Sequence, residues 1–134
     1  MSKRFEASRN AITLLLAVLA LAVSCGPFTE TKLDINDNGS RIEIKRGQVL
    51  AITLESNAST GYIWEVIELD DSILQQVGEP EFRMRSNRPG DPNDMIIRFE
   101  AVNTGQTTLK LLYHRRWEKE EAPQETFSIK VVVR

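Results

Sequence analysis

Cysteine and histidine are each present only once in this chain of 134 residues, as Cys25 and His114. A lone cysteine forms no internal disulfide, so the burial of apolar side chains has to stabilise the fold unaided. A zinc site would lack its usual ligands. A hydroxyl nucleophile such as Ser59 or Thr60 would depend on His114 as its histidine base. We expect His114 instead to be a polar residue at the end of a strand.

The acidic residues also lack the spacing of reactive or metal-binding motifs. They cluster around residues 70–71, 91–94 and 118–121, without the Asp-x-Asp-x-Asp-Gly pattern of a calcium loop. No glycine-rich phosphate loop leads from a strand into a helix. We therefore predict that the chain is not an enzyme and that it binds neither a cofactor nor a metal.

Long apolar runs are scarce, and one stands out at the start of the chain. Residues 11–23 are uncharged and predominantly apolar. The run is shorter than the roughly 20 residues of a membrane-spanning helix, but it suits the core of a signal peptide. It follows Lys3, Arg4 and Arg9 and ends in Leu-Ala-Val-Ser, directly before Cys25.

The residues that end at Cys25 resemble a bacterial lipobox. This resemblance implies cleavage before Cys25 and lipid on the new terminal cysteine, whose acyl chains would anchor the protein to a membrane. The alternative is an ordinary secretory signal cut nearby, which leaves Cys25 as a spare thiol. We expect residues 1–24 to be a lipoprotein signal peptide and residues 25–31 to be the lipidated cysteine and a tether. The expected location is the bacterial cell envelope, with the outer membrane as one option.

Basic residues are in the minority once the leader is set aside. Residues 1–24 hold three of the 17 basic and one of the 19 acidic residues, so the remaining 110 residues carry 14 basic and 18 acidic side chains, a net charge of −4. Nucleic-acid binding depends on clustered Lys and Arg and is not expected. A length of 110 residues suits a single domain, which we place at residues 32–134 and expect to be monomeric.

Helical periodicity is missing from residues 32–134, where apolar residues recur at every second position. Alternation on both sides of a turn at residues 36–40 predicts either a hairpin or a corner at which the chain changes sheets. Residues 70–78 are expected to form a short helical turn or a bulged connection. The other strands predicted from the alternation cover residues 49–55, 62–69, 81–85, 97–101, 109–113 and 127–133.

The apolar faces of these strands supply large side chains for a core, among them Trp64, Phe99, Tyr113 and Phe127. Short strands with one apolar face and turns at regular spacing are typical of two packed antiparallel sheets. We predict an all-β fold, an immunoglobulin-like β-sandwich of about seven to eight strands.

Three loops would lie together at one end of such a sandwich. They are the B–C loop (residues 56–61), the D–E loop (86–94) and the F–G loop (114–124). Loops held by rigid sheets are suited to binding. Taken alone, the B–C loop is an ordinary connection made of turn residues. Trp117 in the F–G loop either folds back over the edge of the sandwich or is an exposed anchor for a partner.

Two of these loops contain motifs of a known kind. The B–C loop and the next strand read Asn57-Ala58-Ser59-Thr60-Gly61-Tyr62 and then Trp64, and the F–G loop contains Arg115-Arg116-Trp117. The first resembles the Asn-x-Thr-Gly-(Tyr/Phe)-x-Trp signature of the chagasin family, with one extra residue before the threonine, and the second resembles its Arg-Pro-Trp motif. The D–E loop departs from the family's Gly-x-Gly-Gly pattern, because it holds a single glycine beside Arg88 and Pro89.

The resemblance covers essentially all of residues 32–134 and implies a reversible, non-covalent inhibitor of papain-like cysteine peptidases. The B–C loop would enter the active-site cleft with Thr60 near the catalytic residues, and the D–E and F–G loops would lie on either side. Trp117 would pack on the peptidase and Arg115 would make polar contacts. The contact residues implied in this way are Asn57, Ser59, Thr60, Gly61, Tyr62, Arg88, Pro89, Gly90, Arg115, Arg116 and Trp117. The alternative is a non-inhibitory envelope lipoprotein that binds another partner through the same loops.

Overall fold

The computed structural model describes residues 29–118 and 120–134, and within them the chain forms nine strands in two sheets. The predicted signal peptide and Cys25 lie outside the described residues. Two short 3₁₀ turns, η1 (Ile35–Asp37) and η2 (Ala58–Thr60), lie between strands. The strands are β1 (Glu30–Leu33), β2 (Arg41–Ile44), β3 (Val49–Ser56), β4 (Ile63–Glu68), β5 (Leu74–Gln76), β6 (Glu81–Met84), β7 (Asn93–Ala101), β8 (Gly105–His114) and β9 (Glu125–Val133). The prediction of an all-β fold is confirmed, with nine strands where seven to eight were expected.

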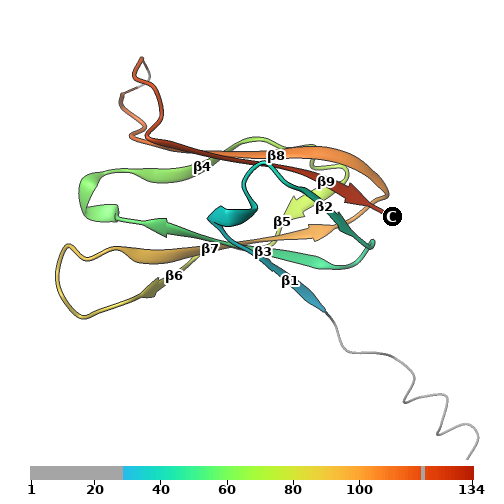
Figure 1. Cartoon of the computed structure of the whole chain (residues 1–134), viewed down its shortest axis with the longest axis horizontal. Coiled ribbons are helices and arrows are strands. Elements are labelled where there is room, and N and C mark those ends of the chain that lie inside the picture. Colours follow the sequence, from blue (N-terminus) through green and yellow to red (C-terminus); the bar gives the residue numbers. More distant parts are fainter. Residues whose placement is uncertain (1–28, 119) are drawn as a thin grey trace, which may run out of the picture.

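The two sheets pack face to face (Figure 1). One has the order β1-β3-β7, with β5 and β6 following each other along the far side of β7. The other has the order β2-β9-β8-β4. Neighbouring strands run antiparallel except for β1 with β3 and β2 with β9, which run parallel. In the part of the chain that the structure describes, no helix is long and apolar enough to span a membrane.

A capped turn carries the chain from the first sheet to the second. The Asp34 carboxylate accepts a hydrogen bond from the Asn36 N–H (2.8 Å), and the Asp37 carboxylate accepts one from the Asp34 N–H (2.9 Å). This capping box ends β1 and begins η1. Asn38 then accepts a hydrogen bond from the Ser128 N–H (2.8 Å) of β9. Of the two arrangements expected here the corner is confirmed and the hairpin is wrong, because β1 and β2 lie in different sheets.

A short strand lies within the segment that was expected to form a helical turn or a bulged connection. The Asp70 carbonyl accepts a hydrogen bond from the Leu74 N–H (3.1 Å) and closes a single helical turn. β5 begins at once, with Leu74 fully buried, and pairs three residues with β7. An alternating pattern cannot be recognised over three residues, so the sequence predicted the turn and missed the strand.

Four strands begin earlier than the apolar pattern indicated. β8 starts at Gly105 and not at residue 109, and β9 starts at Glu125 and not at residue 127. β7 starts at Asn93 and not at Ile97, so the last residues of the predicted D–E loop belong to the sheet. β1 starts at Glu30, two residues before the predicted start of the domain and inside the predicted tether. At β1 and β7 pairing with β3 extends the strand as far as polar residues, Glu30 and Thr31 in β1 and Asn93 and Asp94 in β7, which show no apolar alternation.

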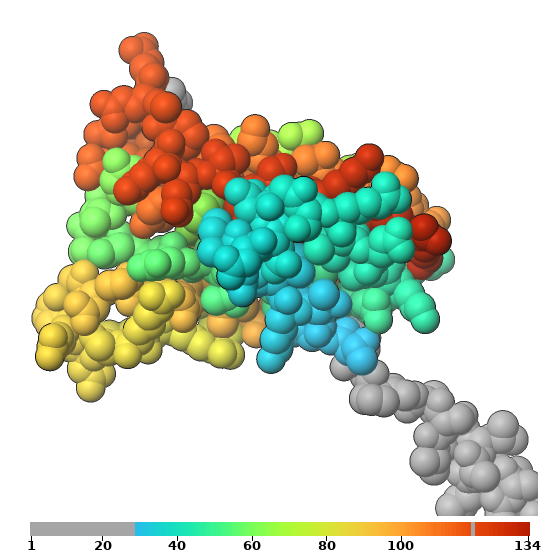
Figure 2. Space-filling model, in the orientation of Figure 1, coloured from blue at the N-terminus to red at the C-terminus, as the bar shows by residue number. Residues whose placement is uncertain are grey.

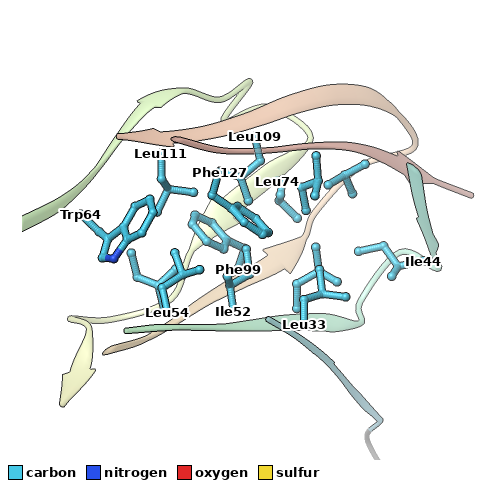
Figure 3. Close-up of a cluster of buried hydrophobic side chains, with 14 of the residues drawn as sticks. Leu33, Ile44, Ile52, Leu54, Trp64, Leu74, Phe99, Leu109, Leu111 and Phe127 are labelled. Atoms are coloured by element: carbon cyan, nitrogen blue, oxygen red, sulfur yellow. The ribbon is translucent and has the colours of Figure 1, made fainter. Parts of the chain in front are cut away.

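The core lies between the sheets, and Figure 3 shows Trp64, Phe99 and Phe127 within it. Tyr113, the fourth predicted aromatic residue, belongs to the same buried cluster. Phe99 and Phe127 are fully buried, and Trp64 and Tyr113 are nearly so. The rings of Trp64 and Tyr113 stack with their centroids 5.0 Å apart, and Trp64 Nε1 donates a hydrogen bond to the Glu55 carbonyl (2.9 Å). Each large buried side chain contributes about 1.5–3 kcal/mol, so a core of this kind supports the fold without a disulfide.

The B–C, D–E and F–G loops meet at one end of the sandwich. β3 ends beside the start of β7, where Ser56 pairs with Asn93, and β8 ends beside the start of β4, where His114 pairs with Ile63. Figure 2 shows the B–C loop in green between the D–E loop in yellow and the F–G loop in orange-red. β1 begins beside Val49, at the opposite end.

Candidate functional site

The B–C loop is a single 3₁₀ turn mounted between two core strands. Asn57 precedes the turn with an extended backbone, and Gly61 ends it in the left-handed region at φ 80°. The Thr60 hydroxyl donates to the Asn57 carbonyl (2.7 Å), and the Gly61 N–H donates to the Ala58 carbonyl (3.1 Å). Ser59 and Thr60 are exposed at the tip. The turn chemistry predicted from the sequence therefore yields a tight, outward-facing tip.

Asn57 uses its side chain and its backbone to hold three parts of the site together. Its N–H donates to the Tyr113 hydroxyl (3.1 Å), which ties the loop to the aromatic end of the core. Its side-chain Oδ1 accepts from the Ser59 hydroxyl (2.6 Å). Its Nδ2 donates to the Gly90 carbonyl (3.1 Å) of the D–E loop. The sequence predicted Asn57 as a contact residue but not its bonds to Tyr113 and Gly90, because these join segments far apart in the chain.

The D–E loop presents Arg88, Pro89 and Gly90 to solvent next to the B–C loop. Ser86 organises it from within, because its hydroxyl donates to the Asp91 carboxylate and accepts from the Arg88 N–H (3.2 Å). Gly90 has φ 87°, so it turns the chain where a residue with a Cβ would be strained.

An ion-pair network joins the two ends of the D–E loop. Arg85 Nε donates to the Asp94 carboxylate (3.0 Å), and the Glu55 carboxylate lies 3.7 Å from Arg85 Nη1. The hydrogen bond to Asp94, and to a lesser degree the charge of Glu55, raise the pKa of Arg85 above its ordinary value. Arg85 therefore stays charged and fixes the point at which the loop leaves β6 and enters β7.

The F–G loop is joined to the B–C loop through Arg115. Arg115 Nε donates to the Thr60 carbonyl (3.0 Å), and its guanidinium lies over the Tyr62 ring, 4.5 Å from the centroid. Arg115 Nη1 also pairs with the Glu118 carboxylate (3.3 Å). A cation above an aromatic face is attracted by the ring quadrupole, so Arg115 holds both the tip and the exit of the B–C loop.

Trp117 lies against the B–C loop while most of its surface stays open. Its side chain is among the most exposed large apolar groups of the described residues, with 70% of its surface accessible. A Cβ at Gly61 would overlap the indole ring. The indole therefore rests on the glycine of the predicted motif and does not fold back into the core, which favours the exposed alternative for this residue.

Arg116 takes the opposite direction from its neighbours. Its side chain is largely exposed, and its Nε donates to the Glu65 carboxylate (3.0 Å) on β4. The same carboxylate oxygen lies 3.8 Å from His114 Nε2. Arg116 is thus directed towards the outer face of the second sheet, away from the B–C tip, and His114 stands at the end of β8 as predicted. Sequence reasoning missed the roles of Glu65 and Glu118, because alternation marks Glu65 only as solvent-facing and Glu118 belongs to a cluster of acidic loop residues without a recognisable motif.

A cleft of about 380 Å³ lies behind the three loops, lined by Asn57, Thr60, Tyr62, Tyr113 and Arg115 together with residues of the neighbouring strands. A smaller hollow of about 190 Å³ separates the B–C loop from the D–E loop. Within the described ranges, no group of three or more His, Cys, Asp and Glu side chains gathers as metal ligands would.

A β-sandwich that presents three interlinked loops at one end defines a protein that binds through its loops. Residues 43–131 match the model of the chagasin family of peptidase inhibitors, I42, and the chain belongs to this family. It is 31% identical over 100 residues to Amoebiasin-2 of Entamoeba histolytica, an alignment that covers 73% of this chain and 80% of that protein. The family consists of inhibitors and not enzymes, so the predictions of family and of a non-enzyme are confirmed.

Solved structures show the same fold. The crystal structure of EhICP2, a cysteine protease inhibitor from Entamoeba histolytica, has a TM-score of 0.71 and 26% identity, and the match covers 81% of this chain and all of that one. The solution structure of Amebosin has a TM-score of 0.64 and 27% identity over the same shares. PbICP-C, solved in complex with falcipain-2, has a TM-score of 0.57 and 20% identity, with 81% and 95% covered.

Proposed function

We propose that this chain is a reversible, non-covalent inhibitor of papain-like cysteine peptidases that blocks the active-site cleft with its B–C, D–E and F–G loops. Membership of a family of peptidase inhibitors supports inhibition over the alternative of a binding module with another role. The position of the B–C tip is the observation that supports assigning these three loops as the inhibitory surface. The tip projects between the other two loops and is bonded to both of them.

The strand order supports the finer description of the fold as immunoglobulin-like. In that description β1, β3, β7 and β6 take the places of strands A, B, E and D, while β9, β8 and β4 take those of G, F and C. The loops between B and C, D and E, and F and G then share one end, which is the end occupied here by the proposed inhibitory loops.

Inhibition by this arrangement is occlusion, and it requires no covalent step. The exposed Ser59 and Thr60 enter the cleft as a narrow tip, and the exposed indole of Trp117 packs on the rim beside it. Strands at both ends of every loop limit the entropy lost on binding. A stable complex of this kind buries about 1,600 Å² in total.

A papain inhibition assay tests the proposal. The purified protein is titrated against papain with a fluorogenic peptide substrate, and the inhibition constant is measured after preincubation and again after dilution. We expect submicromolar inhibition that is lost on dilution, because the complex contains no covalent bond. Full papain turnover at micromolar protein would contradict the proposal, and inhibition that survives long dilution through a covalent adduct would contradict its non-covalent part.

We also propose that Cys25 carries lipid and tethers the domain to the bacterial cell envelope, with papain-like peptidases as its partners at that surface. The support is the sequence of residues 1–25. Labelling cells with radioactive palmitate, and fractionating the membranes, should show label on the wild-type protein and none on Cys25→Ala. Equal labelling of both proteins would contradict the proposal that Cys25 is lipidated and would have no bearing on the proposed inhibition.

A further inference from the structure

We propose that Asn57 is a positioning residue whose carboxamide clasps the D–E loop to the B–C loop in the free protein and so presets the spacing of the inhibitory loops. The effect on inhibition rests on the proposed function, whereas the clasp itself is a property of the uncomplexed molecule. The observation behind it is the hydrogen bond from Asn57 Nδ2 to the Gly90 carbonyl, at 3.1 Å.

The exposed tip of the D–E loop depends on this bond for its position. Residues 87–91 are exposed, and their other hydrogen bonds stay within the loop. The Asp91 N–H donates to the Arg88 carbonyl (3.3 Å), the Arg88 N–H donates to the Ser86 hydroxyl (3.2 Å), and that hydroxyl donates to the Asp91 carboxylate. Within the described part of the chain, the Asn57–Gly90 bond is the one hydrogen bond that joins residues 87–91 to another loop.

Asn57 itself has a fixed position from which to hold the loop. Its N–H donates to the hydroxyl of Tyr113, which is buried and stacked on Trp64. From this anchored backbone its Nδ2 donates to the Gly90 carbonyl, and its Oδ1 separately accepts from the Ser59 hydroxyl. The clasp therefore connects the D–E loop to the core through a single side chain.

A carboxamide is required for both bonds. One end of the group has to accept from the Ser59 hydroxyl while the other end donates to the Gly90 carbonyl. A carboxylate of the same shape only accepts, so it keeps the Ser59 bond and places an oxygen against the Gly90 carbonyl. The hollow of about 190 Å³ between the loops leaves little packing there to replace a lost bond.

The consequence for binding is preorganisation. A D–E loop that is already held at its working distance from the B–C tip loses less entropy when a peptidase closes on both. Losing the clasp should weaken inhibition by roughly fivefold to tenfold, the change that corresponds to the net loss of one hydrogen bond.

Asn57→Asp in the full chain tests the clasp, with Ser59→Ala as the matched control. The primary measurement is ¹⁵N relaxation in the free protein. We expect Asn57→Asp to lower the backbone order parameters of residues 87, 88, 90 and 91, and Ser59→Ala to leave them unchanged. Unchanged order parameters in Asn57→Asp, or an equal fall in both variants, would overturn the inference.

The inhibition constant against papain is the second measurement. A fivefold to tenfold loss in Asn57→Asp together with the lower order parameters supports preorganisation, whereas the same loss with unchanged order parameters makes Asn57 a simple contact residue and overturns it. If the wild-type protein does not inhibit papain, the proposed function fails while relaxation still decides the clasp. Should Asn57→Asp not fold, Asn57→Ala compared with Ser59→Ala isolates the same bond.

Discussion

Gly61 occupies a position that two independent constraints reserve for glycine. Its φ of 80° lies in the left-handed region, and the Trp117 indole occupies the space of a Cβ. We expect Gly61→Ala to destabilise the protein by about 1–2 kcal/mol from the backbone alone and to displace the indole from the B–C loop. The measurements are urea denaturation and the quenching of tryptophan fluorescence by iodide, which should increase in the variant.

Gly39 provides the matched control for this substitution. It has φ 82° with nothing within 4 Å of the place that a Cβ would take. It lies in the turn before β2, outside the three loops, where its N–H donates to the Ser128 carbonyl of β9. Gly39→Ala should lose a similar free energy of unfolding with unchanged quenching. Equal quenching in Gly61→Ala and the wild type would show that the indole does not depend on Gly61.

The two tryptophans should respond to substitution in opposite ways. Trp117 is 70% exposed, so Trp117→Ala should change the free energy of unfolding by less than about 0.5 kcal/mol. Trp64 is buried, and Trp64→Ala should cost about 3–5 kcal/mol. If Trp117 is a binding anchor, Trp117→Ala also weakens papain inhibition at least roughly tenfold. Unfolding of Trp117→Ala, or an unchanged inhibition constant, would argue against that role.

Among the strands, an ion-pair ladder ties both edges of the first sheet to its centre. Arg98 on β7 pairs with Glu30 of β1 (3.3 Å) and Glu81 of β6 (3.0 Å), and Arg83 also pairs with Glu81 (3.1 Å). The hydrogen bonds from Arg98 and, next, from Arg83 lower the pKa of Glu81 below its ordinary value of 4.5. Glu81 therefore helps to hold the short strand β6, from which the D–E loop departs.

This lowered pKa sets the pH dependence of Glu81→Gln. A carboxylate whose pKa is lower in the folded state stabilises the protein above pH 4.5, and that stabilisation is lost as the pH falls through the folded-state value. Glu81→Gln should therefore melt at a lower temperature than the wild type at pH 7, and the two melting temperatures should converge at acidic pH, once the pH has fallen below the folded-state pKa of Glu81 and its carboxyl group is neutral.

Glu79→Gln is the control for the ladder. It also removes an acidic charge, just before β6, but Glu79 forms no ion pair in the described part of the chain. Its melting temperature should follow the wild type at both pH values. A difference between Glu81→Gln and the wild type that persisted at low pH would mean that the ladder is not its source.

The sequence predicted the structure best where a single strand is long enough for its own residues to show which face is buried. Alternation located the long strands and the buried faces of Trp64 and Phe99, because burial on one side of a sheet imposes a period of two. It could not find β5, which is too short for a period, or the early start of β7, where pairing with β3 outweighs polar composition. In the site, local turn chemistry predicted the B–C loop, whereas the bonds from Asn57 to Gly90 and from Arg115 to Thr60 depend on tertiary structure.

For the molecule as a whole, the important relation is the distance between the loops and the start of β1. β1 runs parallel to β3, so Glu30 lies beside Val49, eight residues of strand away from the B–C loop. At about 3.3 Å per residue this separates the two ends by roughly 25 Å. A tether at the β1 end would therefore direct the three loops away from the surface that holds it (Figure 1).

This geometry predicts that anchoring through Cys25 leaves inhibition intact. Protein that begins at Cys25 is coupled through that thiol to a maleimide lipid in vesicles, and its inhibition constant against soluble papain is compared with that of the uncoupled protein. Because the loops lie at the far end of the sandwich, the two constants should agree within about threefold, less than the tenfold step of 1.4 kcal/mol. Coupling instead at a cysteine introduced by Arg88→Cys in a Cys25→Ser background places the vesicle at the loop end and should abolish inhibition. Similar inhibition from both orientations would mean that the three loops are not the surface that meets the peptidase.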